Sequence, residues 1–193
     1  MKVHLAALLA LAALSAGLLA SACGGSGHEE HARSLYNAYR AAEDSRTDAE
    51  EDLRLAFADI SAAAQTLDRE GVVAAATRGQ EAVQKIDDLI AAELEAADGL
   101  AEIESTSAHG KQLSEGLELS RQSLALAAKE LEIALDDPFL DTRKKEVDDL
   151  ARQSADLAVK GELAVRRADR ALALALGLEP RLDQALTTTT TAG

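Results

Sequence analysis

Apolar residues recur at intervals of three and four along the chain after residue 28, which is the spacing of one face of an α-helix. The first such stripe runs from about residue 29 to 68, and its only charged member is Arg46. A stripe of five heptads predicts a long helix packed at a shallow angle against another helix. Its members are Ala32, Leu35, Tyr39, Ala42, Arg46, Ala49, Leu53, Ala56, Ile60, Ala63 and Leu67.

Three further helical stripes follow, at about residues 70–104, 112–135 and 138–178. Asp137-Pro138 is a typical helix start, because proline suits the first helical position. The connections are short, and short connections make consecutive helices antiparallel. The sequence therefore predicts an all-α, elongated, up-down-up-down four-helix bundle with Ala/Leu seams over residues 29–178.

The first helix contains a second start signal. Thr47-x-x-Glu50 matches a capping box, in which side chains at both ends of the first turn bond to free backbone groups. A break near Ser45 would then divide this segment into a short and a longer helix.

Two charged residues interrupt the stripes of the first two helices. With a turn near Glu70, Arg46 lies 24 residues before it and Glu93 lies 23 residues after it, so the two reach the same level of the hairpin. A buried charge without a partner is unfavourable, so we expect Arg46 and Glu93 to form a structural ion pair that fixes the register. The alternative is that Arg46 extends its side chain to solvent.

Small residues are predicted to face each other across the second hairpin. Counting outward from Asp137-Pro138 places Gly116 near Gly161 and Ser120 near Ser154. Such residues indicate close helix contact or, alternatively, a narrow gap for a ligand between the helices, which Gly79 would also line.

The N-terminal segment has the features of an export signal. Lys2 precedes an almost pure Leu/Ala run, and the run ends in Ala20-Ser21-Ala22-Cys23. This order resembles the lipobox of bacterial lipoproteins. The resemblance covers residues 1–23 and implies that residues 1–22 are a signal peptide and that Cys23 carries the lipid. Residues 23–28 would then be the lipidated cysteine and a flexible Gly/Ser linker.

Two alternatives to lipidation remain. An ordinary secretory peptide would be cut after Ala22, and an uncleaved apolar segment of residues 5–22 would span the bilayer. All three interpretations place the rest of the chain outside the cytoplasm. We expect a lipid-anchored protein on the extracytoplasmic face of the cell membrane, in contact with the membrane through Cys23.

Composition and charge exclude several classes of protein. The single Cys excludes a disulfide-stapled domain, and aromatic residues make up only 2% of the chain. Loss of residues 1–22 removes Lys2 and leaves a net charge of −15, of which residues 28–109 carry −12. A protein this acidic, with so few aromatic side chains for stacking, is not expected to bind nucleic acid.

Candidate chemistry is sparse. His28 and His31 are three residues apart and are weak candidates for a metal site, while His109 is expected alone in a loop. We find no catalytic motif and expect neither an enzyme nor a cofactor. The tail, residues 179–193, is expected to be disordered, and its run of threonines could alternatively be O-glycosylated.

The sequence therefore predicts a non-enzymatic helical scaffold or protein-interaction module of the cell envelope, with an unidentified envelope protein as partner. The alternative is a small-ligand or metal-binding envelope lipoprotein. The sequence does not determine the oligomeric state.

Overall fold

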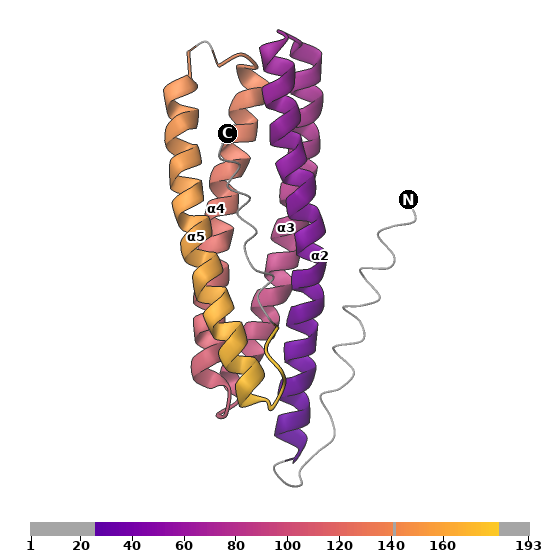
Figure 1. Cartoon of the computed structure of the whole chain (residues 1–193), viewed down its shortest axis with the longest axis vertical. Coiled ribbons are helices and arrows are strands. Elements are labelled where there is room, and N and C mark those ends of the chain that lie inside the picture. The colour runs from indigo at the N-terminus through magenta and orange to yellow at the C-terminus, as the bar shows by residue number, and fades with distance from the viewer. Residues whose placement is uncertain (1–25, 141, 182–193) are drawn as a thin grey trace, which may run out of the picture.

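The computed structural model describes residues 26–140 and 142–181. Within these residues it consists of four helices and contains no strand, which confirms the predicted all-α bundle (Figure 1). Cys23, the segment before it and the threonine run of the tail lie outside the described residues.

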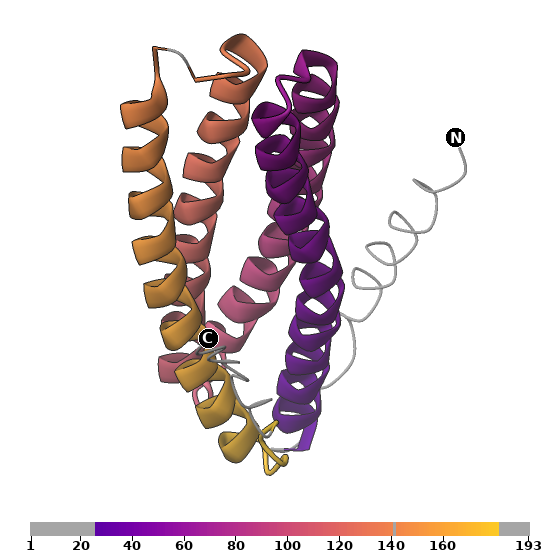
Figure 2. The same ribbon diagram turned by 45° about the horizontal axis from the view of Figure 1, so that its top comes forward.

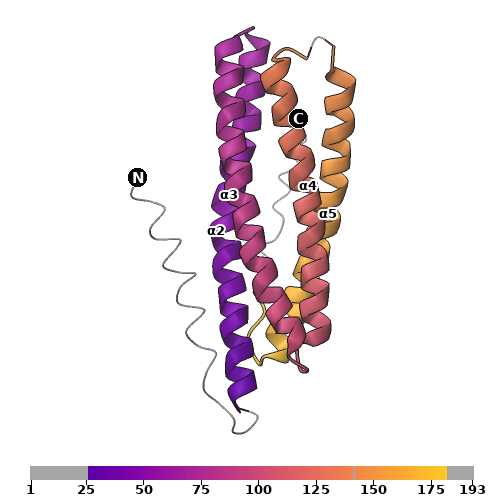
Figure 3. The same ribbon diagram turned by 180° about the vertical axis from the view of Figure 1, so that it is seen from behind.

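The four helices run alternately up and down. They are α2 (Ser26–Gln65), α3 (Arg69–Glu102), α4 (Ser107–Asp136) and α5 (Lys144–Ala175). Close packing joins α2 to α3, α3 to α4, and α4 to α5. Helices α2 and α5 form the face seen in Figure 1, and α3 and α4 form the face seen from behind in Figure 3.

The predicted start of the last helix at Asp137-Pro138 is wrong. Helix α4 runs to Asp136, and α5 begins only at Lys144. Between them the Asp137 carboxylate accepts hydrogen bonds from the backbone N–H and the hydroxyl of Thr142, and Leu140 has a positive φ of 54°. Asp137 therefore stabilises a turn, and Pro138 is buried within the connection.

Other boundaries also differ from the prediction. Helix α2 begins at Ser26, so the predicted flexible linker of residues 23–28 is wrong for residues 26–28. Helix α2 is continuous through Ser45, whose hydroxyl donates to the carbonyl of Ala41 four residues earlier; the hydroxyl of Thr47 bonds back to Glu43 in the same way. These side chains therefore bond inside an unbroken helix rather than cap a new one. Helix α4 begins at residue 107 rather than 112.

The turn between α2 and α3 uses one carboxylate cap. Asp68 precedes α3, and its side chain accepts a hydrogen bond of 3.0 Å from the backbone N–H of Gly71. Leu67, with a positive φ of 57°, reverses the chain just before this cap. The cap satisfies one of the free N–H groups of the first helical turn.

The core lies along the predicted seams and has two parts. The larger part fills the end of the bundle that carries the connection of residues 103–106, which we call the closed end. Its largest fully buried apolar side chains are those of Tyr39, Ile90, Leu100, Leu113, Leu117 and Leu172. A smaller part, centred on Val72, Ala76, Leu131 and Ala134, lies among α2, α3 and α4 toward the other end, which we call the open end.

Close contact between α4 and α5 depends on small residues. A Cβ atom added to Gly161 would lie 2.7 Å from Ser120 Oγ and 2.9 Å from the carbonyl oxygen of Gly116. Gly116 and Gly161 therefore face each other as predicted, whereas Ser154 pairs with Ser123, about one turn from the predicted Ser120. At Gly79 an added Cβ would lie 2.7 Å from Leu131 Cδ2. The gap suggested between the helices is therefore filled at Gly79 and at Gly161.

The bundle splays toward the open end. Figure 2 shows the α2–α3 hairpin and the α4–α5 hairpin converging at the closed end and separating toward the other. The first buried residue of α5 is Gly161, and residues 144–160 contain none. This half of α5 therefore packs on α4 alone.

The sequence of α2 explains the separation. Arg40 contacts α5 near the closed end, and the same face of α2 continues in helical steps through Thr47, Glu51 and Arg54. These residues are polar and exposed, and Glu51 pairs with Arg54 on α2 itself. Because this face offers no apolar surface, packing α5 against it would bury no apolar area.

Candidate functional site

Charged and phenolic side chains meet inside the closed end, where α2, α3 and α5 come together. Five of them come from one broad face of α2, since they recur every three or four residues between positions 36 and 46. We call this group the polar cluster. Its members are Tyr36, Tyr39, Arg40, Glu43 and Arg46 of α2, Glu93 of α3 and Asp169 of α5.

The predicted partners Arg46 and Glu93 form the ion pair that joins α2 to α3. The Arg46 Nε donates to Glu93 Oε1 over 2.6 Å, and Glu93 is fully buried. The Arg46 side chain is 13% exposed and also pairs with Glu50 at the surface. Arg46 therefore connects a buried carboxylate to an exposed one, and it joins α2 to α3 at the level that the sequence predicted.

Glu93 is the most strongly perturbed acid of the cluster. Burial raises the pKa of its carboxyl group to about 7, and Arg46 opposes this shift. Its second oxygen, Oε2, has no hydrogen-bond partner among the described residues. A buried carboxylate with one free oxygen is poorly solvated, so Glu93 binds a proton more readily than an ordinary glutamate.

Asp169 joins α5 to α2. Its Oδ1 accepts a hydrogen bond of 2.8 Å from the Tyr36 hydroxyl, and its Oδ2 pairs with Arg40 over 2.7 Å. The Arg40 guanidinium also lies 5.9 Å from the centre of the Tyr36 ring, at cation–π distance. Burial, together with the bond to Asp169, raises the pKa of Tyr36, so its hydroxyl stays a donor.

The chain beyond α5 is held on α2 at two levels, so the prediction of a disordered tail from residue 179 is wrong for residues 179–181. Arg33 donates to the carbonyl of Leu176 over 3.1 Å. Further along α2, the Arg181 guanidinium makes two hydrogen bonds to Asp44, of 2.6 and 2.8 Å, and lies 3.9 Å from Glu43. The bonds from Arg181 lower the pKa of Asp44. Polar contacts therefore join the two hairpins at the closed end.

The charged and phenolic groups of the polar cluster pair with one another. Each carboxylate of the cluster lies against a guanidinium or hydroxyl group of the same chain, so the cluster joins three helices. The stripe interruptions identified Arg46 and Glu93 but missed Tyr36, Arg40 and Asp169. The sequence signal for Asp169 was its position directly after the seam residue Ala168, which the structure shows to be buried.

The histidines do not form a metal site in the described part of the chain. His28 and His31 are exposed on the first turns of α2, and no group of three His, Cys, Asp or Glu residues among those described is arranged to hold an ion. His109 lies in the first turn of α4 rather than in a loop, and its buried Nδ1 has no hydrogen-bond partner within residues 26–140 and 142–181.

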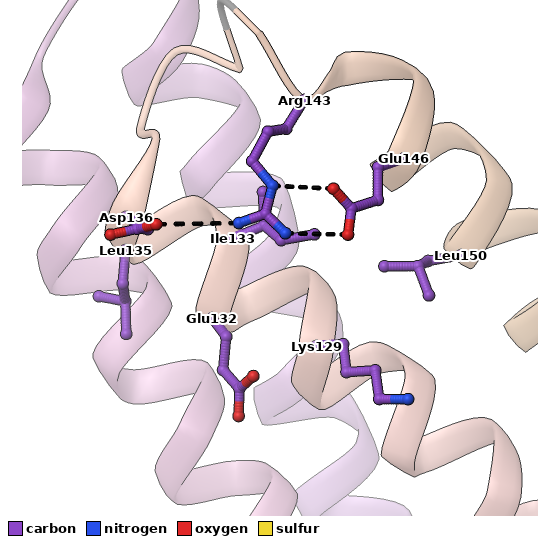
Figure 4. Close-up of a pocket in the computed structure, with 8 residues that line it drawn as sticks. All are labelled: Lys129, Glu132, Ile133, Leu135, Asp136, Arg143, Glu146 and Leu150. Atoms are coloured by element: carbon purple, nitrogen blue, oxygen red, sulfur yellow. Dashed lines mark hydrogen bonds and ion pairs between the residues drawn. The ribbon is translucent and has the colours of Figure 1, made fainter.

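A surface groove lies where α4 ends and α5 begins (Figure 4). The Arg143 guanidinium crosses it, with 2.8 Å contacts to Glu146 and a 3.8 Å contact to Asp136. Because two carboxylates already surround this cation, the groove offers no free guanidinium to a ligand. It is lined by Lys129, Glu132, Ile133, Leu135, Asp136, Arg143, Glu146 and Leu150.

Glu130 is a second acid whose environment disfavours ionisation. It lies partly buried on α4, and burial raises the pKa of its carboxyl group to about 7 with no charged group opposing the shift. Seven residues separate Glu130 from Ser123, which contacts Ser154 of α5, so the two share a helix face. Glu130 therefore lies on the face of α4 that packs on α5 and has no ion pair among the described residues.

Comparisons with known proteins identify no relatives. No protein-family model matches the chain, no curated protein matches it, and no solved structure matches it. Among the described helices, none combines the length and the apolar character needed to cross a membrane.

Proposed function

We propose that this protein is a non-enzymatic interaction module of the cell envelope, tethered to the outer face of the cell membrane through Cys23, that presents α5 to a protein partner. One observation carries the proposal. Of the five large apolar side chains most exposed on the described residues, three lie on α5: Val159, Leu163 and Leu174, which are 55%, 50% and 62% exposed.

These three residues share one face of the helix with two arginines. Arg152, Val159, Leu163, Arg170 and Leu174 follow one another at steps of seven, four, seven and four residues, and each is exposed. We call this line of residues the α5 outer stripe. It lies opposite the positions that pack on α4, such as Gly161 and Val165. Exposed apolar residues interleaved with arginine are typical of interaction surfaces.

The polar cluster favours a binding role over catalysis. Its acids and bases bond to one another and join the helices, so they act on the fold rather than on a substrate. The surface outside the cluster is dominated by ion pairs between neighbouring turns of the same helix, which are weak and solvated. Arg152 belongs to such a pair with Asp149, so these pairs do not account for Arg170 and the three exposed apolar side chains of the α5 outer stripe.

The tether is supported by the lipobox-like residues before Cys23. Helix α2 begins at Ser26, only three residues after Cys23, and its first turn lies at the closed end of the bundle (Figure 1). With Cys23 acylated, the closed end faces the membrane and the splayed helices point away from it. This orientation leaves α5 accessible to other envelope proteins.

Crosslinking mass spectrometry on intact cells that express the full chain tests this function. We expect crosslinks from α5 to a partner, their loss in Leu163→Glu, and their retention in the matched control Leu67→Glu, which changes an exposed leucine in the α2–α3 turn. Metabolic labelling with a palmitate analogue should modify the wild-type chain and not Cys23→Ser. Crosslinks that survive Leu163→Glu would contradict the role of α5, and an unlabelled wild-type chain would contradict the tether.

A further inference from the structure

We infer that residues 182–186, which follow the last described residue, bind back along α2 of the same chain and place Leu186 over Leu55. In this arrangement they form an extended segment on the exposed side of α2, which we call the strap. The inference goes beyond the proposed function and does not depend on the partner of α5. It is carried by the course of residues 176–181, which lead the chain from α5 onto α2.

A Schellman motif ends α5 and turns the chain out of the helix. Gly177 has a positive φ of 68°, and the backbone N–H of Leu178 donates to the carbonyl of Ala173. Beyond this motif residues 178–181 contain no helix, and Pro180 favours an extended backbone in the residue before it. The chain therefore leaves α5 as an extended segment.

Two contacts set the direction of this segment and its rise along α2. Arg33 holds the carbonyl of Leu176, and Asp44 holds the guanidinium of Arg181. Five steps of the segment thus accompany eleven residues of α2. Eleven helical residues rise about 16.5 Å, and five extended residues span about the same length. The segment therefore runs close to fully extended, in the direction of the open end.

The next step of the same length arrives at Leu55. Arg33, Asp44 and Leu55 follow one another at steps of eleven residues, which is about three helical turns, so they share one side of α2. Continued at the same rise, the chain brings Leu186 to the level of Leu55. Leu55 is 46% exposed, the most exposed large apolar side chain within α2, α3 and α4. Contact between the two leucines would remove apolar surface of both from water.

The splay of the bundle leaves room beside this path (Figure 2). Counting from the pair of Arg40 and Asp169 places Ala158 of α5 at the level of Glu51 of α2, eleven residues along each helix. Ala158 is small and exposed, because this half of α5 packs on α4 alone. An extended strap fits the polar side of α2 here, since its backbone N–H and C=O groups still reach water and only its leucines need apolar contact.

The strap also determines how a partner approaches α5. It occupies the side of α5 that faces α2, whereas the α5 outer stripe lies opposite α4 and stays open. A partner therefore reaches α5 through the stripe rather than between α2 and α5. The disorder expected for the tail is then confined to residues 187–193.

Disulfide formation in the full chain tests the level of the strap. The background is Cys23→Ser, which removes the only native thiol. In this background Leu186→Cys should form an intramolecular disulfide about tenfold faster with Leu55→Cys than with Thr47→Cys, because the strap raises the effective concentration of the first pair. Thr47 is a matched site, since it is exposed and lies on the same helix.

The same comparison identifies a free tail. Thr47 lies closer than Leu55 to Asp44, where Arg181 is held. A tail that is free beyond Arg181 would therefore join Leu186→Cys to Thr47→Cys at least as fast, and this result would overturn the inference. Leu182→Cys should show the opposite preference to Leu186→Cys, because residue 182 lies near the level of Thr47.

Thiol alkylation tests the cover while Leu186 is intact. The thiol of Leu55→Cys, again in the Cys23→Ser background, should react about threefold faster once Leu186→Asp is added, because access limits its reaction. Val159→Cys is the control, since Val159 is 55% exposed on the α5 outer stripe and should not respond. Far-ultraviolet circular dichroism should show all variants equally helical.

An alkylation rate of Leu55→Cys that ignores Leu186→Asp would also overturn the inference. The proposed function is tested separately, because its crosslinks are compared between the wild-type chain and Leu163→Glu, which both keep residues 182–186. Loss of the strap would therefore leave the α5 result standing, and loss of the α5 crosslinks would leave the disulfide result standing.

Discussion

At the scale of single residues, buried charge determines how the helices align. Arg46 and Glu93 each interrupt an apolar seam, and the structure brings them together over 2.6 Å. Asp169 makes the corresponding connection between α5 and α2 through Tyr36 and Arg40. A buried pair need not stabilise the fold more than an apolar pair would, but removing one partner leaves the other charge uncompensated.

Arg46→Met should therefore lower the free energy of unfolding more than replacement of both members of the pair. At pH 8 we expect Arg46→Met to lower the free energy of unfolding by about 3 kcal/mol, because the buried Glu93 must then either stay ionised without a partner or take up a proton. Arg46→Met/Glu93→Met should recover most of this loss, because both charges are then gone. Urea denaturation of both variants measures the difference; equal stability of the single and double variants would argue against an energetic role for the pair.

Glu130 gives a pH-dependent prediction. Its pKa in the folded protein is raised by burial to about 7 from an ordinary value near 4.5, so the folded state binds the proton more tightly than the unfolded state. The stabilisation is complete below about pH 4.5 and is lost as the pH rises to about 7. Glu130→Gln should therefore match the wild-type chain at pH 4 and exceed its free energy of unfolding at pH 8 by on the order of 1 to 3 kcal/mol.

Glu93 titrates over a similar pH range in both proteins, so its contribution cancels when their free energies of unfolding are subtracted. The remaining pH dependence belongs to Glu130. Chemical denaturation at intervals between pH 4 and pH 8 gives the difference curve. A difference that does not change with pH would show that Glu130 does not titrate in this range.

At the scale of elements, small residues determine how closely the helices approach. Ser123 and Ser154 share hydrogen bonds across the α4–α5 contact, and Gly161 lies against Ser120 and the backbone of Gly116. At Gly99, by contrast, an added Cβ would meet only the end of the Leu35 side chain, 2.9 Å away. Glycine is therefore required at the first contact and replaceable at the second.

Gly161→Ala and Gly99→Ala make a matched pair of variants. Alanine gains about 1 kcal/mol of helix propensity at either site. At Gly161 the new methyl group would press on the Gly116 carbonyl, so we expect a net loss of about 1 to 2 kcal/mol; at Gly99 the Leu35 side chain can move, so we expect no loss. Thermal unfolding of the two variants decides this, and equal melting temperatures would mean that α4 and α5 are less closely packed than described.

At the scale of the whole molecule, the two hairpins are held together at one end only. Polar contacts join α2 to α5 near the closed end, whereas residues 144–160 of α5 contain no buried side chain. The splay leaves the first half of α5 with one packed face, and both halves carry part of the α5 outer stripe. Association through this surface would supply the contacts that the bundle itself omits.

Hydrogen exchange measures this asymmetry directly. Amides of residues 148–160 should exchange faster than those of residues 161–175, because opening the first half of α5 breaks contacts to α4 alone. Peptide-level exchange with mass spectrometry compares the two halves within one helix of one sample. Uniform protection along α5 would contradict the splayed arrangement.

The helical class, the antiparallel order and the level at which Arg46 meets Glu93 could all be predicted from the amino-acid sequence. Each follows from local periodicity, short connections and the rule that Arg46 and Glu93 cannot both be buried unpaired. Three features became visible only in the packed molecule. These are the start of α5, the pairing of Asp169 with Tyr36 and Arg40, and the distance to which the hairpins separate. The physical reason is that the turn after Asp137 and the partners of Asp169 depend on side chains distant in the sequence or on bonds within a loop, which helical spacing does not encode.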